Sequence, residues 1–271
     1  MPKIGMASCA MMATRWMNPL KVAAENGFDA FEISCVFPSA EPENTPSAVI
    51  DKARNILEKS GMEICVHSPF MELNIGAFNK GIRDESIRSI NKAADMCEAL
   101  GGEVMIVHSG TFTYDQLRRA TKDNHPLVKI QWDYNIDSLK KINDYANSKG
   151  ITVGVENIGF NSLDQTFEDL LEIREAVGSS LKFTVDFGHA RLAQGGEEAI
   201  RVLGEHIRHI HLTDNHGEND DHLPVGDGNY DYSGILDFLH DFPYIITLET
   251  VDLGVDPQPV LRGFENIKKM L

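Results

Sequence analysis

The segment Ile106-Val107-His108-Ser109-Gly110 ends a short apolar run at one histidine, and a turn of small residues follows it. The segments Cys65-Val66-His67-Ser68-Pro69 and Gly154-Val155-Glu156-Asn157 follow the same plan, with an ionisable side chain where the apolar run stops. Short β-rich runs like these alternate with amphipathic helical stretches along the chain, a pattern typical of repeated βα units on a parallel sheet. The sequence therefore predicts parallel strands, several of which end at an ionisable residue.

Eight strands are expected from this pattern, with helical stretches between them. The strands are Lys3 to Ala7, Ala30 to Ser34, Glu63 to His67, Val104 to His108, Thr152 to Glu156, Phe183 to Asp186, His209 to Leu212 and Tyr244 to Glu249. The helical stretches include Pro19 to Asn26, Ser47 to Ser60, Asp84 to Leu100, Tyr134 to Lys149, Thr166 to Val177 and Ala199 to His206. Several of them are followed by glycine, which readily adopts the left-handed conformation at which helices end.

The number and spacing of the strands favour an α/β fold, a closed (β/α)₈ barrel in a single domain over residues 1–271. A barrel of this kind typically takes about 250 residues. The alternative is an open doubly wound sheet, but no Gly-rich dinucleotide-binding turn follows the first strand, where Ser8 to Met17 is instead rich in methionine. The longest irregular stretch, Gly110 to Trp132, is expected to form a lid or a wall over the site.

Composition and charge narrow the class of protein further. No apolar run approaches the roughly 20 residues that a membrane helix needs, and no secretion-type leader is visible, so a cytoplasmic protein without a membrane partner is expected. The cysteines Cys9, Cys35, Cys65 and Cys97 form no CxxC pair and are expected to be reduced thiols. A net charge of -16 disfavours a general nucleic-acid binder, although bound cations could still hold one phosphate locally.

Potential metal ligands end six consecutive strands of the expected barrel. The three later examples are Val185-Asp186-Phe187-Gly188-His189, Ile210-His211-Leu212-Thr213-Asp214 and Thr247-Leu248-Glu249-Thr250. The carboxyl ends of barrel strands converge on one rim, and burying so many ionisable groups together is prohibitive unless cations compensate their charge. A lone histidine at a strand end is more often a core residue, but six such groups together predict a metal centre. Imidazole and carboxylate ligands suit Zn²⁺ best and Mn²⁺ next.

A further group of candidate ligands follows the seventh strand. The segment from Asp220 to Gly228 contains the pair Asp220 and His222 in a loop that ends in a Gly-rich turn. Together with His189, this pair could complete a separate metal centre close to the first. His209 lies two residues before His211 and therefore faces the same way one layer deeper in the barrel, where a core or supporting role is expected.

These residues resemble those of the xylose-isomerase-like superfamily of TIM barrels, and in particular endonuclease IV, the AP endonuclease family 2. The resemblance covers nearly the whole chain, and the nine side chains with which that family holds three zinc ions have chemically identical counterparts here in the same order. It implies one ion on His67, His108 and Glu156, a second on Asp186, His211 and Glu249 with Glu156 as a bridge, and a third on His189, Asp220 and His222. It also implies hydrolysis of a phosphoester by a hydroxide held between two ions.

Two loops bear on the substrate that the resemblance implies. The loop after the second strand carries a basic residue in endonuclease IV, but reads Phe37-Pro38-Ser39-Ala40-Glu41-Pro42-Glu43 here and has no cation. Phe70-Met71 lies where that family presents an aromatic and aliphatic wedge to the abasic site. DNA is therefore disfavoured, and a small phosphorylated or sugar substrate is expected.

The leading hypothesis from the sequence is a zinc phosphoesterase with up to three ions, acting on a small sugar phosphate or an abasic-type substrate. The alternative within the superfamily is a sugar or sugar-phosphate isomerase or epimerase, in which one Mn²⁺-like ion lies on Glu156, Asp186, His211 and Glu249. Glu156 and Glu249 would then face each other across the sugar as catalytic acid and base. A metal-dependent binding barrel without catalysis is a third hypothesis.

Two features of the sequence weigh against the isomerase. It leaves His67, His108 and the pair Asp220 and His222 without a role. Such isomerases also commonly supply an arginine for substrate hydroxyls after the seventh strand, and the tract from His211 to Asp221 contains none. The acidic net charge and the loop without a cation weigh in its favour.

Overall fold

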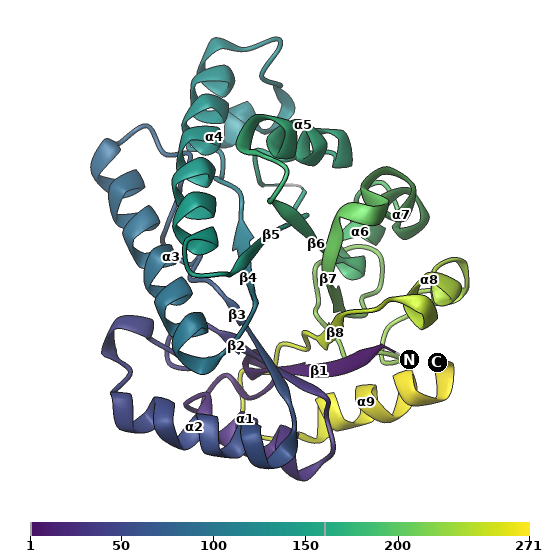
Figure 1. Cartoon of the computed structure of the whole chain (residues 1–271). Helices are drawn as coiled ribbons and strands as arrows, with labels where there is room; N and C mark the ends of the chain where they lie inside the picture. The colour runs from purple at the N-terminus through teal and green to yellow at the C-terminus, as the bar shows by residue number, and fades with distance from the viewer. Residues whose placement is uncertain (1, 160) are drawn as a thin grey trace.

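A closed barrel of parallel strands forms the centre of the molecule, and helices surround it (Figure 1). The computed structural model describes residues 2–159 and 161–271. Each strand pairs with the next along the chain, and β8 closes the barrel by pairing with β1. The strands are β1 Lys3–Ala7, β2 Ala30–Ser34, β3 Glu63–His67, β4 Val104–His108, β5 Thr152–Glu156, β6 Lys182–Asp186, β7 Ile207–Leu212 and β8 Ile245–Leu248. The predicted (β/α)₈ fold is confirmed.

The bounds of the first five strands agree with those predicted, and the last three differ by one or two residues. β6 begins at Lys182 because this residue pairs with Gly154 of β5, and β7 begins at Ile207 because it pairs with Phe183. β8 ends at Leu248, so Glu249 lies directly after the strand. Strand ends depend on pairing with a neighbour, which the local sequence does not contain.

Nine helices are described in residues 2–159 and 161–271. They are α1 Met17–Glu25, α2 Ser47–Ser60, α3 Lys80–Leu100, α4 Pro126–Asn147, α5 Phe167–Val177, α6 Phe187–Leu192, α7 Gly196–Leu203, α8 Leu236–Asp241 and α9 Gln258–Met270. Short 3-10 turns occur at Ser8–Met11, Pro42–Asn44, Asp115–Arg119, Gly204–His206 and Tyr232–Gly234. None of these helices combines the length and the apolarity required to cross a membrane.

Three helices lie outside the helical stretches named from the sequence. The helices α6 and α8 are six residues long, too short to show a full amphipathic repeat. The helix α9 does place Val260, Gly263, Phe264 and Ile267 on one buried face, but a glycine within that face weakens the pattern. Packing against the barrel is what stabilises these elements.

The predicted irregular stretch from Gly110 to Trp132 is too long: residues 110–125 are irregular apart from the 3-10 turn Asp115–Arg119, but residues 126–132 belong to α4. The helix α4 begins at Pro126, where a proline in the first turn costs no hydrogen bond and where the His125 side chain accepts from the backbone N–H of Leu127. The remainder is tied to its surroundings, because Gly110 N donates to Asn135 Oδ1 at 2.7 Å and Thr111 pairs with Ser162 in an isolated bridge. Residues 110 and 111 are therefore anchored beside the strand ends, and the role of the segment as a lid or a wall stays a prediction.

The interior of the barrel is unusually polar. Alternate residues of a strand face opposite ways, so Phe31 and Ile33 of β2 pack in the large apolar layer under the helices while Glu32 points into the barrel. Glu32 there meets His209 of β7, and both are fully buried. Barrels of this class are normally filled by branched apolar side chains. Polar groups buried in this position therefore call for an explanation.

A close backbone contact joins the loops after β3 and β4, and a substitution at Gly110 tests this contact. A Cβ on Gly110 would lie 2.5 Å from the backbone nitrogen of Gly76, where neither partner is a flexible side chain. We expect Gly110→Ala to lower the free energy of unfolding by about 1–3 kcal/mol through overpacking, measured by urea denaturation. Gly81→Ala, at the exposed start of α3, is the control and should stay near wild type. A Gly110 variant as stable as wild type would contradict this contact.

Candidate metal centre

The ends of β3, β4 and β5 bring His67, His108 and Glu156 together. His108 and Glu156 are register partners in the β4–β5 ladder, so their side chains leave the barrel rim side by side. Glu156 Oε2 lies 3.2 Å from His67 Nε2 and 3.0 Å from His108 Nε2. His67 Nδ1 lies 2.9 Å from the carbonyl oxygen of Ser68, a contact that places its proton on Nδ1 and leaves Nε2 free to bind a cation.

A second group contains Glu156, Asp186, His211 and Glu249, whose ligand atoms all lie within 4.8 Å of one another. His211 Nδ1 is 3.1 Å from Glu156 Oε1 and 3.0 Å from Glu249 Oε2. Asp186 is fully buried, and its Oδ2 has no hydrogen-bond partner within the described part of the chain. A buried carboxylate oxygen without a donor is costly in a low-dielectric interior. The donor set therefore fits a divalent cation, and Glu156 offers its two oxygens to two different groups.

The third group, His189, Asp220 and His222, lies at the edge of the second. Asp220 Oδ2 is 3.1 Å from the Nε2 atoms of both histidines. The other ring nitrogen of each histidine faces a backbone carbonyl, Asn157 O for His189 and Glu249 O for His222, both at 3.1 Å. These contacts orient both Nε2 atoms toward one point, as the residues around a bound metal usually do.

The loop that supplies Asp220 and His222 is organised by Asp214. The carboxylate of Asp214 accepts hydrogen bonds from the backbone N–H groups of Gly226, Gly228 and Tyr230 at 3.0–3.1 Å. His222 itself adopts a positive φ of 45°, which is rare for a residue with a Cβ. Strain of this kind persists where the surroundings determine the conformation, and here it turns the imidazole toward His189.

The site is strongly anionic, and the pKa values of His189 and His222 show this, whereas burial lowers the pKa of His108. Burial alone would lower the pKa of His189, but Asp186 and Asp220 outweigh it and raise this pKa to about 10. Burial would also lower the pKa of His222, but Asp220 and Glu249 outweigh it and raise this pKa to about 9. Burial also raises the pKa of Asp186 above its ordinary value. The neighbouring carboxylates stabilise the protonated form of His189 and His222, and bound cations would take the place of those protons.

The structure brings together all nine side chains that the sequence singled out, and it also shows a buried group that the sequence did not. Glu32 lies below His211, 2.9 Å from His209 Nε2 and 3.2 Å from His211 Nε2. The signal available in the sequence was a charged residue in the middle of the otherwise apolar strand Ala30–Ser34. His209 lies one layer deeper than His211, as expected.

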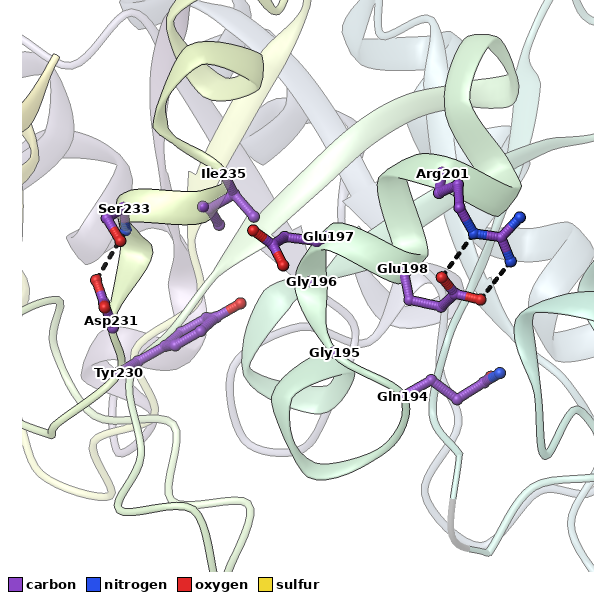
Figure 2. A pocket seen from close by; sticks show the side chains of 11 residues that line it. Gln194, Gly195, Gly196, Glu197, Glu198, Arg201, Tyr230, Asp231, Ser233 and Ile235 are labelled. Atoms are coloured by element: carbon purple, nitrogen blue, oxygen red, sulfur yellow. Dashed lines mark hydrogen bonds and ion pairs between the residues drawn. The ribbon is translucent and has the colours of Figure 1, made fainter.

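Phe70, in the loop after β3, packs against two of the candidate ligands, His67 and His108. The ring of Phe70 stacks on that of His108 with centroids 4.3 Å apart, so this residue packs on a candidate ligand. Met71 and Phe37 are exposed on neighbouring loops. A separate hollow of about 570 Å³ lies between the start of α7 and residues 230–235, and none of the nine side chains lines it (Figure 2). The Arg201 guanidinium in that hollow is already paired with Glu198.

Comparison with known proteins agrees with this geometry. Residues 20–270 match the family model of the xylose isomerase-like TIM barrel, and the chain belongs to this family. An uncharacterized protein of Methanocaldococcus jannaschii is 31% identical over 98% of this chain and 90% of its own length. The crystal structure of a D-tagatose 3-epimerase-like protein superimposes with a TM-score of 0.84 at 28% identity, covering 99% of this chain and 96% of that one.

Two more distant relatives have functional names. Fructoselysine 3-epimerase of Escherichia coli O157:H7 is 23% identical over 83% of this chain and 81% of its own length. A probable endonuclease 4 of Haloarcula marismortui is 24% identical over 68% of this chain and 70% of its own length. The resemblance noted in the sequence is thereby confirmed, with sugar epimerases among the relatives that match more of the chain.

Metal removal provides a test of the centre. A ligand that binds only the folded state stabilises it by about 2.7 kcal/mol at one hundred times its Kd, which corresponds to roughly 5–10 °C in a domain of this size. We expect Zn²⁺ or Mn²⁺ to raise the Tm of chelator-treated protein by this amount, measured by differential scanning calorimetry. His211→Ala should lose the increment, and His240→Ala, altered at an exposed position of α8, should keep it. Equal increments in both variants would place the ion elsewhere.

Proposed function

We propose that this protein is a metal-dependent epimerase or isomerase of a small sugar or sugar phosphate, with a ketose or keto-sugar derivative as the substrate class. The observation that carries the proposal is the position of Glu156 and Glu249. They come from β5 and from the end of β8, which are not neighbours in the barrel, yet both approach Nδ1 of His211 within about 3 Å. Two carboxylates on different sides of one cation can address the two faces of a bound carbon.

The residues divide the reaction between them. Glu156, Asp186, His211 and Glu249 would hold one divalent cation, which when bound polarises the substrate carbonyl and acidifies the neighbouring C–H. One of the two glutamates removes the proton from that carbon, and the electron pair moves toward the carbonyl oxygen. The other glutamate returns a proton to the opposite face, so the configuration inverts without net oxidation. Each carboxylate ends the turnover in the protonation state opposite to its initial one.

The comparisons support this assignment over the hydrolase that the sequence alone favoured. The epimerase-like crystal structure and the fructoselysine 3-epimerase match more of this chain than the endonuclease relative does. The loop after the seventh strand lacks an arginine of its own but contacts one from another element, because the guanidinium of Arg191 in α6 donates to Asn215 O at 2.8 Å. A cationic side chain therefore reaches this loop from the neighbouring βα unit.

Phosphoester hydrolysis is the second candidate, and one specific observation favours it. An isomerase with a single ion needs only the second group, yet the pair His67 and His108 and the trio His189, Asp220 and His222 are oriented around further points. Three Zn²⁺ ions on these nine side chains would supply a bridging nucleophile and would stabilise the leaving oxygen. The two candidates thus differ in the number of ions that activity requires.

Substitution of the two glutamates tests the epimerase. We expect Glu156→Gln and Glu249→Gln each to reduce turnover by about 100-fold or more, because a general acid or base contributes on this scale. The measurement is NMR of deuterium incorporation at the carbon beside the carbonyl, in D₂O, with ketopentoses, ketohexoses and their phosphates. Glu175→Gln, on the exposed side of α5, is the matched control. Exchange at the wild-type rate in either active-site variant would exclude the proposed proton transfer.

The number of ions tests which reaction the centre supports. We expect full epimerase activity with one Mn²⁺ or Zn²⁺ per chain, determined by plasma mass spectrometry on the active preparation. His222→Ala, which removes a ligand of the third group only, should leave epimerisation within a few-fold of wild type. Activity that needs about three zinc ions, is lost in His222→Ala and releases a phosphate or alcohol product would instead identify the hydrolase.

A further inference from the structure

The most unusual buried group outside the nine candidate ligands is the carboxylate of Glu32. This residue of β2 is fully buried inside the barrel, one layer below the rim. Its Oε2 lies 2.9 Å from His209 Nε2, 3.2 Å from His211 Nε2 and 3.5 Å from the thiol of Cys65. Its Oε1 has no hydrogen-bond partner in residues 2–159 and 161–271. An interior carboxylate with one oxygen unpaired opposes folding, so its presence calls for a function.

The imidazole of His211 connects this carboxylate to the rim. Its Nδ1 faces Glu156 and Glu249, and its Nε2 faces Glu32 on the opposite side of the ring. A neutral imidazole carries one N–H, and the other nitrogen can bind a cation only if it carries no proton. A cation on Nδ1 therefore requires a proton on Nε2 and an acceptor for that proton, and Glu32 is placed to be this acceptor.

We propose that Glu32 is a positioning residue that holds His211 as the Nε2–H tautomer, with the lone pair of Nδ1 directed at the cation site. A carboxylate that accepts from the far nitrogen fixes both the tautomer and the ring orientation, and it makes the ligand nitrogen more basic. This inference rests on the proposed role of His211 as a ligand, a role that the epimerase and the hydrolase share. It does not depend on which of the two reactions occurs.

His209 supports Glu32 from the side. Its Nε2 contacts both Glu32 Oε2 and the hydroxyl of Thr247, which lies 3.1 Å away in β8. Two imidazole N–H groups and one thiol thus point at the same oxygen and partly compensate its charge in the interior. Rotation of Glu32 away from His211 would break the contact with His209 as well, so the acceptor is held in place.

A metal ion on Glu32, Cys65 and His209 is the competing explanation, since their ligand atoms lie within 4.8 Å of one another. Three observations argue against it. Glu32 Oε2 already faces two ring nitrogens, the Cys65 thiol acts as a donor to it, and His209 Nε2 is engaged by Glu32 and Thr247. The cluster is thus arranged as donors around one acceptor, whereas a metal site presents acceptors around one point.

Glu32→Gln tests the proposal, because the amide keeps the shape of the side chain and loses the charge. We expect the Kd for Mn²⁺ and for Zn²⁺ alone, measured by isothermal titration calorimetry on chelator-treated full-length protein, to rise by roughly 10- to 100-fold. Long-range ¹H–¹⁵N NMR of histidine-labelled protein should show Nε2–H at His211 in wild type and a mixture of tautomers in the variant. Cys65→Ala is the matched control, because it removes only the weakest of the three donors to Glu32 Oε2. This variant should bind metal within a few-fold of wild type.

The alternative roles give different results. A purely structural Glu32 would leave the Kd and the tautomer of His211 unchanged while lowering the Tm of the metal-free protein, which would overturn the proposal. Loss of one ion per chain in both Glu32→Gln and Cys65→Ala would identify the deep metal site and would overturn it too. His211→Ala distinguishes failure of the proposed function from failure of this inference. A variant that binds as many ions per chain as wild type, with the same Kd, refutes the assignment of His211 as a ligand. Loss of one ion per chain in His211→Ala, with unchanged binding in Glu32→Gln, refutes only the positioning role.

Glu32→Asp serves as a second variant in case the glutamine protein does not fold. It keeps the negative charge in the interior but withdraws the acceptor by one methylene from Nε2 of His211. We expect weaker metal binding than in wild type, with a smaller loss than in Glu32→Gln. Failure of both variants to fold would show that the fold itself needs the residue, which contradicts a role confined to positioning.

Discussion

Repulsion among buried carboxylates is the constraint on which the rest of this structure depends. Glu156, Asp186 and Glu249 are almost entirely buried at one mouth, and Asp220 lies beside them. Like charges at such separations cannot all persist in a low-dielectric site without protons or cations between them. The histidines interleaved with them provide either, since each can carry a proton or bind a metal. The barrel holds these groups in place because they come from the ends of paired strands, from the start of α6 and from the loop that Asp214 organises.

The support for the site extends into the barrel as a second polar layer. Branched apolar residues normally occupy this position, but Glu32, His209 and Thr247 occupy it here and are fully buried. Such a layer contributes less to stability than an apolar one would, since it contains a carboxylate oxygen that has no partner among the described residues. The arrangement is understandable if the polar layer positions the candidate ligands at the rim. The large apolar layer between the strands and the helices then stabilises the fold.

One set of ligand side chains is compatible with two chemistries, and the surroundings of the set distinguish them. In the proposed epimerase the central four residues would carry proton transfer beside a carbonyl, while in the hydrolase the outer groups would hold further ions for phosphate chemistry. Function on a shared barrel is determined by loops and by the local chemistry of the site. Here the loop after β2 contributes an exposed Phe37 and no cation, and Phe70 packs its ring on His108. These features are consistent with the small-molecule substrate proposed for this site.

The sequence by itself determined the strands, the barrel and the set of candidate ligands, because a buried strand and the residue that ends it are both local features of the chain. It did not determine where β6, β7 and β8 begin or end, since those bounds depend on pairing with residues far away in the sequence. The course of residues 110–132 was also decided in the folded molecule, where Gly110 and Thr111 contact Asn135 and Ser162. Only the tertiary structure showed that Glu32 lies under His211, because closure of the barrel brings β2 and β7 face to face across the interior.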